Sequence, residues 1–296
     1  MKPNSKRTAA VLAILAAVFY AINIPFSKRL MEHIDPTVMA SLLYMGAGLG
    51  VAMLYCFNPG QKDKGERFTR KDLPYTVIML LLDVLAPICL MMGVSLGTAA
   101  DASLLGNFEI VATTLIALRF FHEKVSGKLW AAIALITVAS ILLSFDGASG
   151  LSLSVGSLFV LLATCCWGLE NNCTRMLSGK NTYRLVIMQS FFSCCGSMLV
   201  ALFRGERLPA PRYALWAMLL GAIAYGLSIF LYIRAQRTIG AAKTSAFYAI
   251  GPFVGGGLSL AINGEKPTLF FAIALCVMIA GTVLVVKDTL DNGKAE

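Results

Sequence analysis

Long apolar stretches follow one another along the whole 296-residue chain, and they constrain the fold more than any other feature. Each stretch exceeds the roughly 17 residues that a helix needs to cross the hydrocarbon core of a bilayer. In lipid the backbone must satisfy its own hydrogen bonds, so these stretches are helices and not strands. The sequence therefore predicts an all-α polytopic membrane protein with ten transmembrane helices, at approximately 8–30, 36–57, 73–95, 99–120, 126–145, 154–176, 182–203, 212–233, 241–263 and 267–287.

The composition and the placement of basic residues indicate the same class. Charged residues make up only 14% of the chain, against roughly 25% in an average soluble domain. The net charge of +9 lies in short runs between the apolar stretches, which is typical of cytoplasmic loops and not of a nucleic-acid-binding surface. With the N-terminus inside, 19 of the 25 Lys and Arg residues fall on the cytoplasmic side. We therefore expect a multi-pass protein of the plasma (cytoplasmic) membrane, in contact with lipid and not with nucleic acid, with both termini in the cytoplasm.

The two halves of the chain repeat. A shift of 142 residues aligns small and charged residues of the first half with the same types in the second half: Ala99, Ala100, Ser103, Glu123 and Lys124 with Ala241, Ala242, Ser245, Glu265 and Lys266. A shift of 147 residues aligns the first stretch with the sixth. Five stretches per unit is an odd number, so the second copy enters the membrane from the opposite side, as in many transporters. We expect two inverted five-helix repeats, residues 1–145 and 154–287.

Three segments of the chain resemble the EamA-type members of the drug/metabolite transporter superfamily: AADASLLGNFEIV followed by HEK, GAAKTSAFYAIGPFV followed by GEK, and WGLENNCTRML. The resemblance covers nearly the whole chain. Members often carry Glu-Pro where this chain has Glu109-Ile110 in one half and Gly251-Pro252 in the other. The resemblance implies two five-helix repeats and transport of amino acids or related metabolites.

Charged residues deep within the stretches give the sharpest functional signal. All of them are acids, namely Asp83, Glu109 and Glu170, and no Lys or Arg lies in the middle third of any stretch. A charge at the bilayer centre costs roughly 2.5–3.5 kcal/mol on insertion scales. Either the acids face a water-filled cavity, where they bind protons or a cationic substrate, or each is protonated and hydrogen-bonded inside the bundle. We prefer the functional interpretation for Glu109 and leave both open for Asp83 and Glu170.

Polar and aromatic residues within the stretches are the other candidates for a substrate site. Asn23 aligns with Glu170 at the 147-residue shift, which favours a shared central cavity, although an ordinary interhelical hydrogen bond explains Asn23 equally well. Four aromatic residues lie away from the expected membrane interfaces and either line the cavity or pack between helices: Tyr20, Trp167, Tyr225 and Tyr248.

Proline and glycine mark expected hinges and close contacts. Proline in a membrane helix removes a backbone hydrogen bond, so Pro25, Pro87 and Pro252 are candidate hinges. GxxxG pairs favour close packing of helices within the chain, and homodimerisation is the alternative, so the protein is a monomer or a homodimer. The pairs are Gly46/Gly50, Gly93/Gly97 and Gly251/Gly255.

Signatures of a metal, cofactor or enzyme site are absent. The eight cysteines form no CxxC pair and no histidine accompanies them, so we expect no metal and no cofactor. The sequence contains no Walker A, HExxH or Gly-x-Ser-x-Gly motif, which argues against ATP-driven transport and common hydrolases.

Together these features predict a secondary transporter that exports a small metabolite, such as an amino acid or a related compound, by alternating access with proton coupling. Efflux of lipophilic cations or drugs is the alternative within the same class. An intramembrane enzyme or a structural membrane subunit is the alternative from another class. It is disfavoured because no two of the three deep acids share a stretch and no nucleophile accompanies them.

Overall fold

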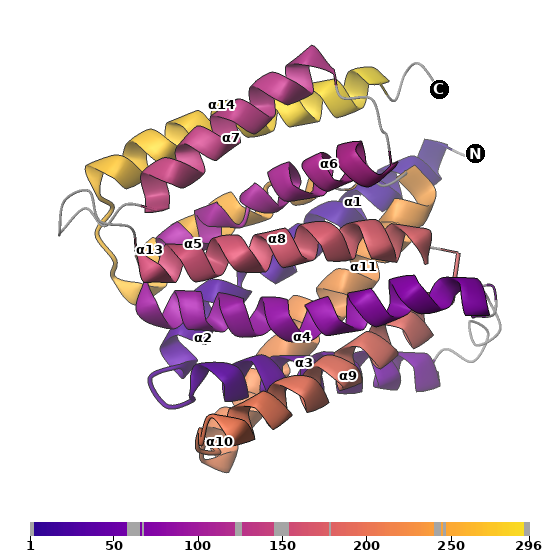
Figure 1. The fold of residues 1–296 in the computed structure, drawn as a ribbon, viewed down its shortest axis with the longest axis vertical. Helices are drawn as coiled ribbons and strands as arrows, with labels where there is room; N and C mark the ends of the chain where they lie inside the picture. Colours follow the sequence, from indigo (N-terminus) through magenta and orange to yellow (C-terminus); the bar gives the residue numbers. More distant parts are fainter. Residues whose placement is uncertain are drawn as a thin grey trace.

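The computed structural model describes residues 3–57, 66, 68–121, 126–144, 154–177, 179–239, 244 and 247–292. Apart from one isolated bridge between Glu66 and Lys180, regular structure in this part of the chain is helical (Figure 1). The helices are α1 (Pro3–Ala21), α2 (Asn23–Leu30), α3 (Pro36–Phe57), η2 (Arg70–Asp72), α4 (Leu73–Leu96), α5 (Ala99–Leu105), α6 (Phe108–Phe121), α7 (Gly127–Ser144), α8 (Val155–Met176), α9 (Thr182–Phe203), α10 (Pro211–Gly221), η3 (Ala222–Leu227), α11 (Ser228–Ile239), α13 (Gly251–Asn263) and α14 (Leu269–Asn292).

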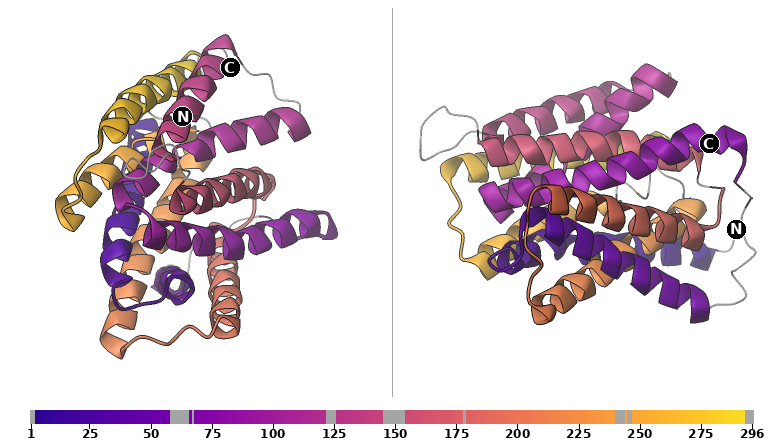
Figure 2. Two further views of the ribbon diagram at one scale, coloured as in Figure 1. Left: turned by 60° about the vertical axis from the view of Figure 1, so that its left-hand side comes forward. Right: turned by 60° about the horizontal axis from the view of Figure 1, so that its bottom comes forward.

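Helices that are distant in sequence lie side by side in one bundle (Figures 1 and 2). α7 packs along α14 at one edge, α4 packs along α8, α3 along α9, and α1 along α11. Each of these pairs joins a helix of the first half of the chain to a helix of the second half. The two halves therefore interlock and share one apolar core.

Eight helical segments in the described part of the chain are long and apolar enough to cross a membrane. α8 and α13 lie among them without meeting that criterion. α8 is less apolar because its second half carries Glu170, Asn171 and Asn172, and α13 has 13 described residues. The described part of the chain is thus helical, as predicted, and helix length together with hydropathy identifies eight of the ten predicted spans.

Four of the predicted spans are not continuous α-helices, and in the ninth a turn at Ala249 and Ile250 precedes α13. The first is divided at Ile22 into α1 and α2, and the fourth is divided at Gly106 and Asn107 into α5 and α6. The eighth contains η3, a π-helical segment. Hydropathy predicts unbroken helices here because it records side-chain polarity and not backbone hydrogen bonding.

The three candidate hinge prolines lie in different backbone settings. Pro25 is the third residue of α2, directly after the division at Ile22, and Pro252 is the second residue of α13. Both positions suit proline because the first N–H groups of a helix lack intrahelical acceptors. Pro87 lies inside α4, which continues through it without interruption.

Glycine allows helices to cross at backbone contact. A Cβ atom on Gly46 would lie 1.8 Å from the Met218 carbonyl oxygen, and one on Gly221 would lie 1.9 Å from the Leu43 carbonyl oxygen. α3 and α10 therefore pack backbone to backbone, which is the helix-packing role predicted for the GxxxG pairs within the chain. The other predicted glycines with a neighbouring helix within 4 Å of such a Cβ atom are Gly50, Gly93, Gly97, Gly251 and Gly255.

Charged side chains cap helix ends across the bundle. The two carboxylate oxygens of Glu265 accept hydrogen bonds of 2.8 Å from the backbone N–H groups of Ala99 and Ala100 at the start of α5. Lys28 Nζ donates hydrogen bonds of 2.7 Å to the carbonyl oxygens of Val94 and Gly97 at the end of α4. These contacts satisfy terminal backbone groups and place each charge at the favourable end of a helix dipole.

We expect Gly221→Ala to destabilise the protein by about 1–3 kcal/mol, because the added methyl group would overlap the backbone of α3. The measurement is thermal unfolding of the purified protein in detergent. Gly257→Ala is the matched control, since no atom lies within 4 Å of a Cβ there. The control should unfold at the wild-type temperature or slightly above it. Equal melting temperatures for the two variants would contradict the proposed crossing.

Candidate functional site

Three acids lie in the interior on three different helices. Asp83 of α4 is 1% exposed, Glu170 of α8 is 7% exposed, and Glu109 of α6 is half-buried. We call these residues the central acids. Glu170 interacts electrostatically with both Asp83 and Glu109. None of them forms an ion pair with a Lys or Arg in the described part of the chain.

Neutral side chains hold the central acids in place. Asn171 Nδ2 donates a hydrogen bond of 2.6 Å to Glu109 Oε1. The Thr174 hydroxyl donates to the carboxylate of Glu170, one helical turn away on α8. These donors orient the carboxylates but leave their charge uncompensated, so a proton or a bound cation is needed to balance it.

The division between α5 and α6 positions Glu109. Gly106 and Asn107 interrupt the helix, and α6 begins at Phe108, so Glu109 occupies its first turn. The positive end of the α6 dipole therefore lies beside the carboxylate and stabilises its charged form. Interrupted helices whose ends point into the interior form the ion and substrate sites of several transporter folds.

An aromatic cluster surrounds Tyr20, which comes from α1. The ring centroid of Tyr20 lies 5.6 Å from that of Tyr248, 5.9 Å from Tyr225 and 6.4 Å from Trp167. The structure thus brings together all four aromatic residues predicted from the sequence. Two further rings complete what we call the aromatic cluster, each 5.0 Å from a member: Tyr44 beside Tyr225 and Tyr232 beside Tyr248.

Asn23 connects α2 to the same cluster. Its amide Nδ2 donates a hydrogen bond of 3.1 Å to the Tyr225 hydroxyl, and its Oδ1 accepts one of 3.0 Å from Ser27. Asn23 is completely buried. The interhelical hydrogen bond considered for Asn23 is therefore present, and it fixes the ring of Tyr225 within the aromatic cluster.

The central acids lie within electrostatic range of the aromatic cluster. Glu109 interacts with the hydroxyl-bearing rings of Tyr20 and Tyr248, and Asp83 interacts with those of Tyr44 and Tyr225. All eight residues predicted for the site therefore belong to one neighbourhood built from α1, α2, α4, α6, α8 and η3, together with Tyr248. Asn171, Tyr44 and Tyr232 are additions that the sequence did not single out.

The arrangement suits a cation. Aromatic faces attract positive charge by about 0.5–2 kcal/mol per contact, with the larger values where water is excluded. The carboxylates add negative charge that no described Lys or Arg neutralises by ion pairing. No group of three or more His, Cys, Asp and Glu residues suited to a metal ion occurs among the described residues.

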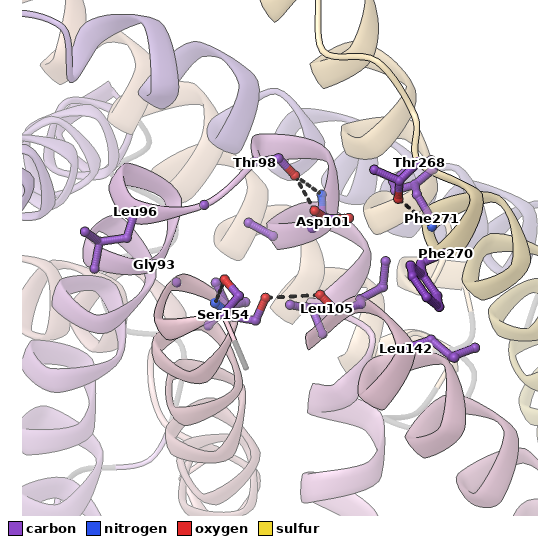
Figure 3. Close-up of a pocket in the computed structure, with 16 residues that line it drawn as sticks. Gly93, Leu96, Thr98, Asp101, Leu105, Leu142, Ser154, Thr268, Phe270 and Phe271 are labelled. Carbon is purple, nitrogen blue, oxygen red and sulfur yellow. Dashed lines mark hydrogen bonds between the residues drawn. The ribbon is translucent and has the colours of Figure 1, made fainter. Parts of the chain in front are cut away.

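A separate cavity of about 350 Å³ lies away from the central acids (Figure 3). It opens where α4 ends and where α5, α8 and α14 begin, between Leu142 and Phe270 on one side and Gly93 on the other. Asp101 lines it and is already hydrogen-bonded to Thr98, whose hydroxyl lies 2.6 Å from the carboxylate. None of the eight predicted site residues lines this cavity.

Comparison with known proteins identifies the family. The family model described as "EamA-like transporter family" matches twice, over residues 7–145 and 154–287. An "Uncharacterized transporter" of Methanothermobacter thermautotrophicus is 24% identical over 290 residues, which cover 92% of this chain and 84% of that protein. One crystal structure of another protein aligns with a TM-score of 0.71 and 14% identity, covers 96% of this chain and 98% of its own, and supports the fold alone. The chain belongs to the EamA-like transporter family, within the drug/metabolite transporter superfamily.

Proposed function

We propose that this transporter is a secondary exporter of a small metabolite with a protonated amino group, such as an amino acid or a related amine, in exchange for protons. The observation that carries the proposal is the set of central acids, which lie in the interior beside the aromatic cluster and have no Lys or Arg partner among the described residues. A substrate ammonium group would bind between Glu109 and the rings, and protons would replace it after release. Each state of the cycle would then keep the buried charge balanced.

Alternating access in the proposed mechanism uses ten spans arranged as two inverted repeats, residues 1–145 and 154–287. Helix pairing supports this arrangement. In the two repeats, α4 corresponds to α11 and α8 corresponds to α1, so the α4–α8 pair is equivalent to the α11–α1 pair. The α3–α9 pair and the α7–α14 pair are each equivalent to themselves. All four pairs are in contact. The divisions before α6 and before α13 also fall near equivalent positions at the 142-residue shift. Pro25, Pro87 and Pro252 are proposed hinges in the rocking of one repeat against the other.

A second candidate is efflux of lipophilic cations, and the aromatic cluster is the observation that favours it. Six rings at centroid separations of 5.0–6.4 Å offer more cation–π surface than a primary amine requires. A panel of radiolabelled amino acids, polyamines and quaternary ammonium dyes in proteoliposomes separates the two candidates. Counterflow of amino acids supports the first, and counterflow restricted to the dyes supports the second.

Glu109→Gln should abolish proton-coupled flux of whichever panel member the wild type carries. The amide keeps the shape of the side chain and the contact with Asn171 but cannot exchange a proton, so we expect flux to fall by at least about tenfold. The measurement is uptake into proteoliposomes across a series of imposed pH gradients. Glu32→Gln, at an exposed residue paired with Arg29, is the control and should retain wild-type flux. Unchanged, still pH-dependent flux in Glu109→Gln would remove this role.

Tyr20 provides a test of cation recognition by the rings. Tyr20→Phe keeps the aromatic face, so we expect its half-saturating substrate concentration to stay near that of the wild type. Tyr20→Leu removes the face and should raise that concentration by about 3–30-fold, corresponding to one desolvated cation–π contact. The measurement is the concentration dependence of initial uptake. Equal values for the two variants would argue against a cation at this position.

We further propose that the protein lies in the plasma membrane with both termini in the cytoplasm. Green fluorescent protein fused after the C-terminus should then fluoresce. Alkaline phosphatase fused within residues 204–210, between α9 and α10, should be active, whereas fusion at Gly179, between α8 and α9, should leave it inactive. The opposite pattern of phosphatase activity would invert the proposed topology.

A further inference from the structure

One face of α9 carries a continuous polar stripe through an apolar bundle. Gln189, Ser190, Ser193 and Ser197 follow one another at one-, three- and four-residue intervals and are 0–5% exposed. Such spacing places them on one side of the helix. From Gln189 to Ser197 the stripe extends about 12 Å along the helix axis.

Residues of α3 and α4 face this stripe. Ser41 Oγ donates a hydrogen bond of 2.9 Å to the carbonyl oxygen of Cys194, and the Ser193 hydroxyl donates to the carbonyl oxygen of Asp83. The side chain of Gln189 is the hydrogen-bond partner of the Asp83 carboxyl group. We call the following set the polar track: Thr37, Ser41, Asp83, Gln189, Ser190, Ser193 and Ser197.

The polar track concentrates unsatisfied hydrogen-bonding groups. Among described residues, eleven buried side-chain nitrogen and oxygen atoms lack a hydrogen-bond partner, and five of them belong to the track: Thr37 Oγ1, Asp83 Oδ2, Gln189 Oε1, Ser190 Oγ and Ser197 Oγ. Leaving such a group unpaired costs about 1–3 kcal/mol. Buried water is the usual partner of polar groups that protein atoms leave unsatisfied.

Local bonding within the helix does not remove this cost. Elsewhere in the chain, hydroxyl groups donate to the carbonyl oxygen four residues earlier at 2.7–2.8 Å, as Ser103, Ser144 and Ser259 do. Ser190 and Ser197 have no such bond. Their hydroxyl groups are thus available to water between α3, α4 and α9.

The two ends of the polar track differ. One end lies at the start of α3, where Glu206 Oε2 accepts hydrogen bonds from the backbone N–H groups of Thr37 and Val38 at 3.0 and 2.9 Å, while Glu206 Oε1 pairs with Arg204 Nε at 3.0 Å. The other end is Asp83, beside Gln189. Towards the start of α9 the next inward residues are apolar, since Leu185 and Val186 are 1% and 0% exposed. The track therefore leads from Glu206 to Asp83 and stops there.

Among the described residues, Asp83 faces titratable groups from three neighbouring elements and no Lys or Arg. These groups are Glu170 from α8, Tyr44 from α3 and Tyr225 from η3, while α9 contributes the amide of Gln189. Glu109 contacts Asn171 and lies near Tyr20 and Tyr248. Asp83 and Glu109 thus have different sets of neighbouring side chains.

We propose that the polar track is a water-filled route that conducts protons between Glu206 and Asp83, separate from the path of the substrate through the aromatic cluster. The role of the polar track in coupling rests on the proposed proton exchange, but the presence of water in the track is independent of that exchange. A proton enters at the Glu206 end, and each water molecule or hydroxyl group on the route accepts one proton and donates one. The Asp83 carboxylate receives the proton at Oδ2 and later releases one proton towards Glu170, so no charge accumulates in the track.

Radiolytic footprinting tests the hydration of the track without any substrate. X-ray radiolysis of bound water produces hydroxyl radicals in place, and these oxidise adjacent thiols. Cys194 lies in the stripe with its Sγ atom 3.4 Å from Ser41 Oγ, and Cys89 is the matched control because the two residues are 3% and 4% exposed. We expect Cys194 to be oxidised at least about tenfold faster than Cys89, as a water-lined thiol would be. Equal rates in the wild-type protein would overturn the proposal.

Infrared spectroscopy tests proton access to Asp83. In acidic medium, the difference spectrum of wild type minus Asp83→Asn isolates the carboxyl band, and a change to D2O shifts that band as the proton exchanges. The double variant Ser190→Ala/Ser197→Ala should slow this exchange by at least about tenfold, because it removes two groups that hold water. Ser140→Ala removes an equally unpartnered hydroxyl on α7, outside the track, and should exchange at the wild-type rate. An unchanged rate in the double variant would overturn the route.

Neither measurement uses a transport substrate, so a failure of the proposed function leaves both results interpretable. A panel without transported amines, together with fast oxidation of Cys194, would reject the amine exporter and retain the hydrated track. Transported amines, together with equal oxidation of Cys194 and Cys89, would support the amine exporter and reject the hydrated track.

Discussion

The rest of this structure depends on one constraint, namely three interior carboxyl groups that have no basic partner among the described residues. Asp83, Glu109 and Glu170 have neutral side-chain partners, namely an amide from Gln189, an amide from Asn171 and the hydroxyl of Thr174. Such partners contribute roughly 1.5–3 kcal/mol to a charged group, which does not offset complete desolvation of a carboxylate. A state with three bare negative charges would therefore be unstable in this bundle. In the proposed cycle, protons or cations therefore enter and leave with every change of state.

The frame around these acids is nearly symmetric, but the site is not. The helix divided before α6 corresponds to the one divided before α13, so both repeats direct a helix N-terminus into the interior. Only the first repeat places an acid there, Glu109, where the second has Gly251 and Pro252. In the proposed mechanism, the symmetric frame lets the two repeats exchange roles during alternating access, and the single acid gives the substrate one orientation in both states.

Sequence reasoning recovers the helical class and most of the helix positions, and it singles out eight residues that the structure places in one neighbourhood, because a charge or a polar ring in an apolar stretch is conspicuous. It cannot recover the division at Gly106, since turns inside membrane helices depend on packing that supplies partners for the freed backbone groups. Asn171 is not singled out because it lies in the polar run from Glu170 to Asn172, and the sequence does not show which of these side chains faces Glu109. Tyr44 and Gln189 were missed because only the packing of α3 and α9 against α4 gives them a role.

The burial of the central acids favours a division of labour. Glu109 is half-buried, sits at a helix N-terminus and lies near the rings, so a bulky cation can reach it. Asp83 is 1% exposed, with the Gln189 side chain at its carboxyl group and the Ser193 hydroxyl at its backbone carbonyl oxygen, so it is less accessible to a bulky cation than Glu109. Glu170 interacts electrostatically with both. In the proposed cycle, a proton that binds Asp83 therefore weakens the binding of a cation at Glu109 without contact between the two, because the charges of both acids are coupled through Glu170.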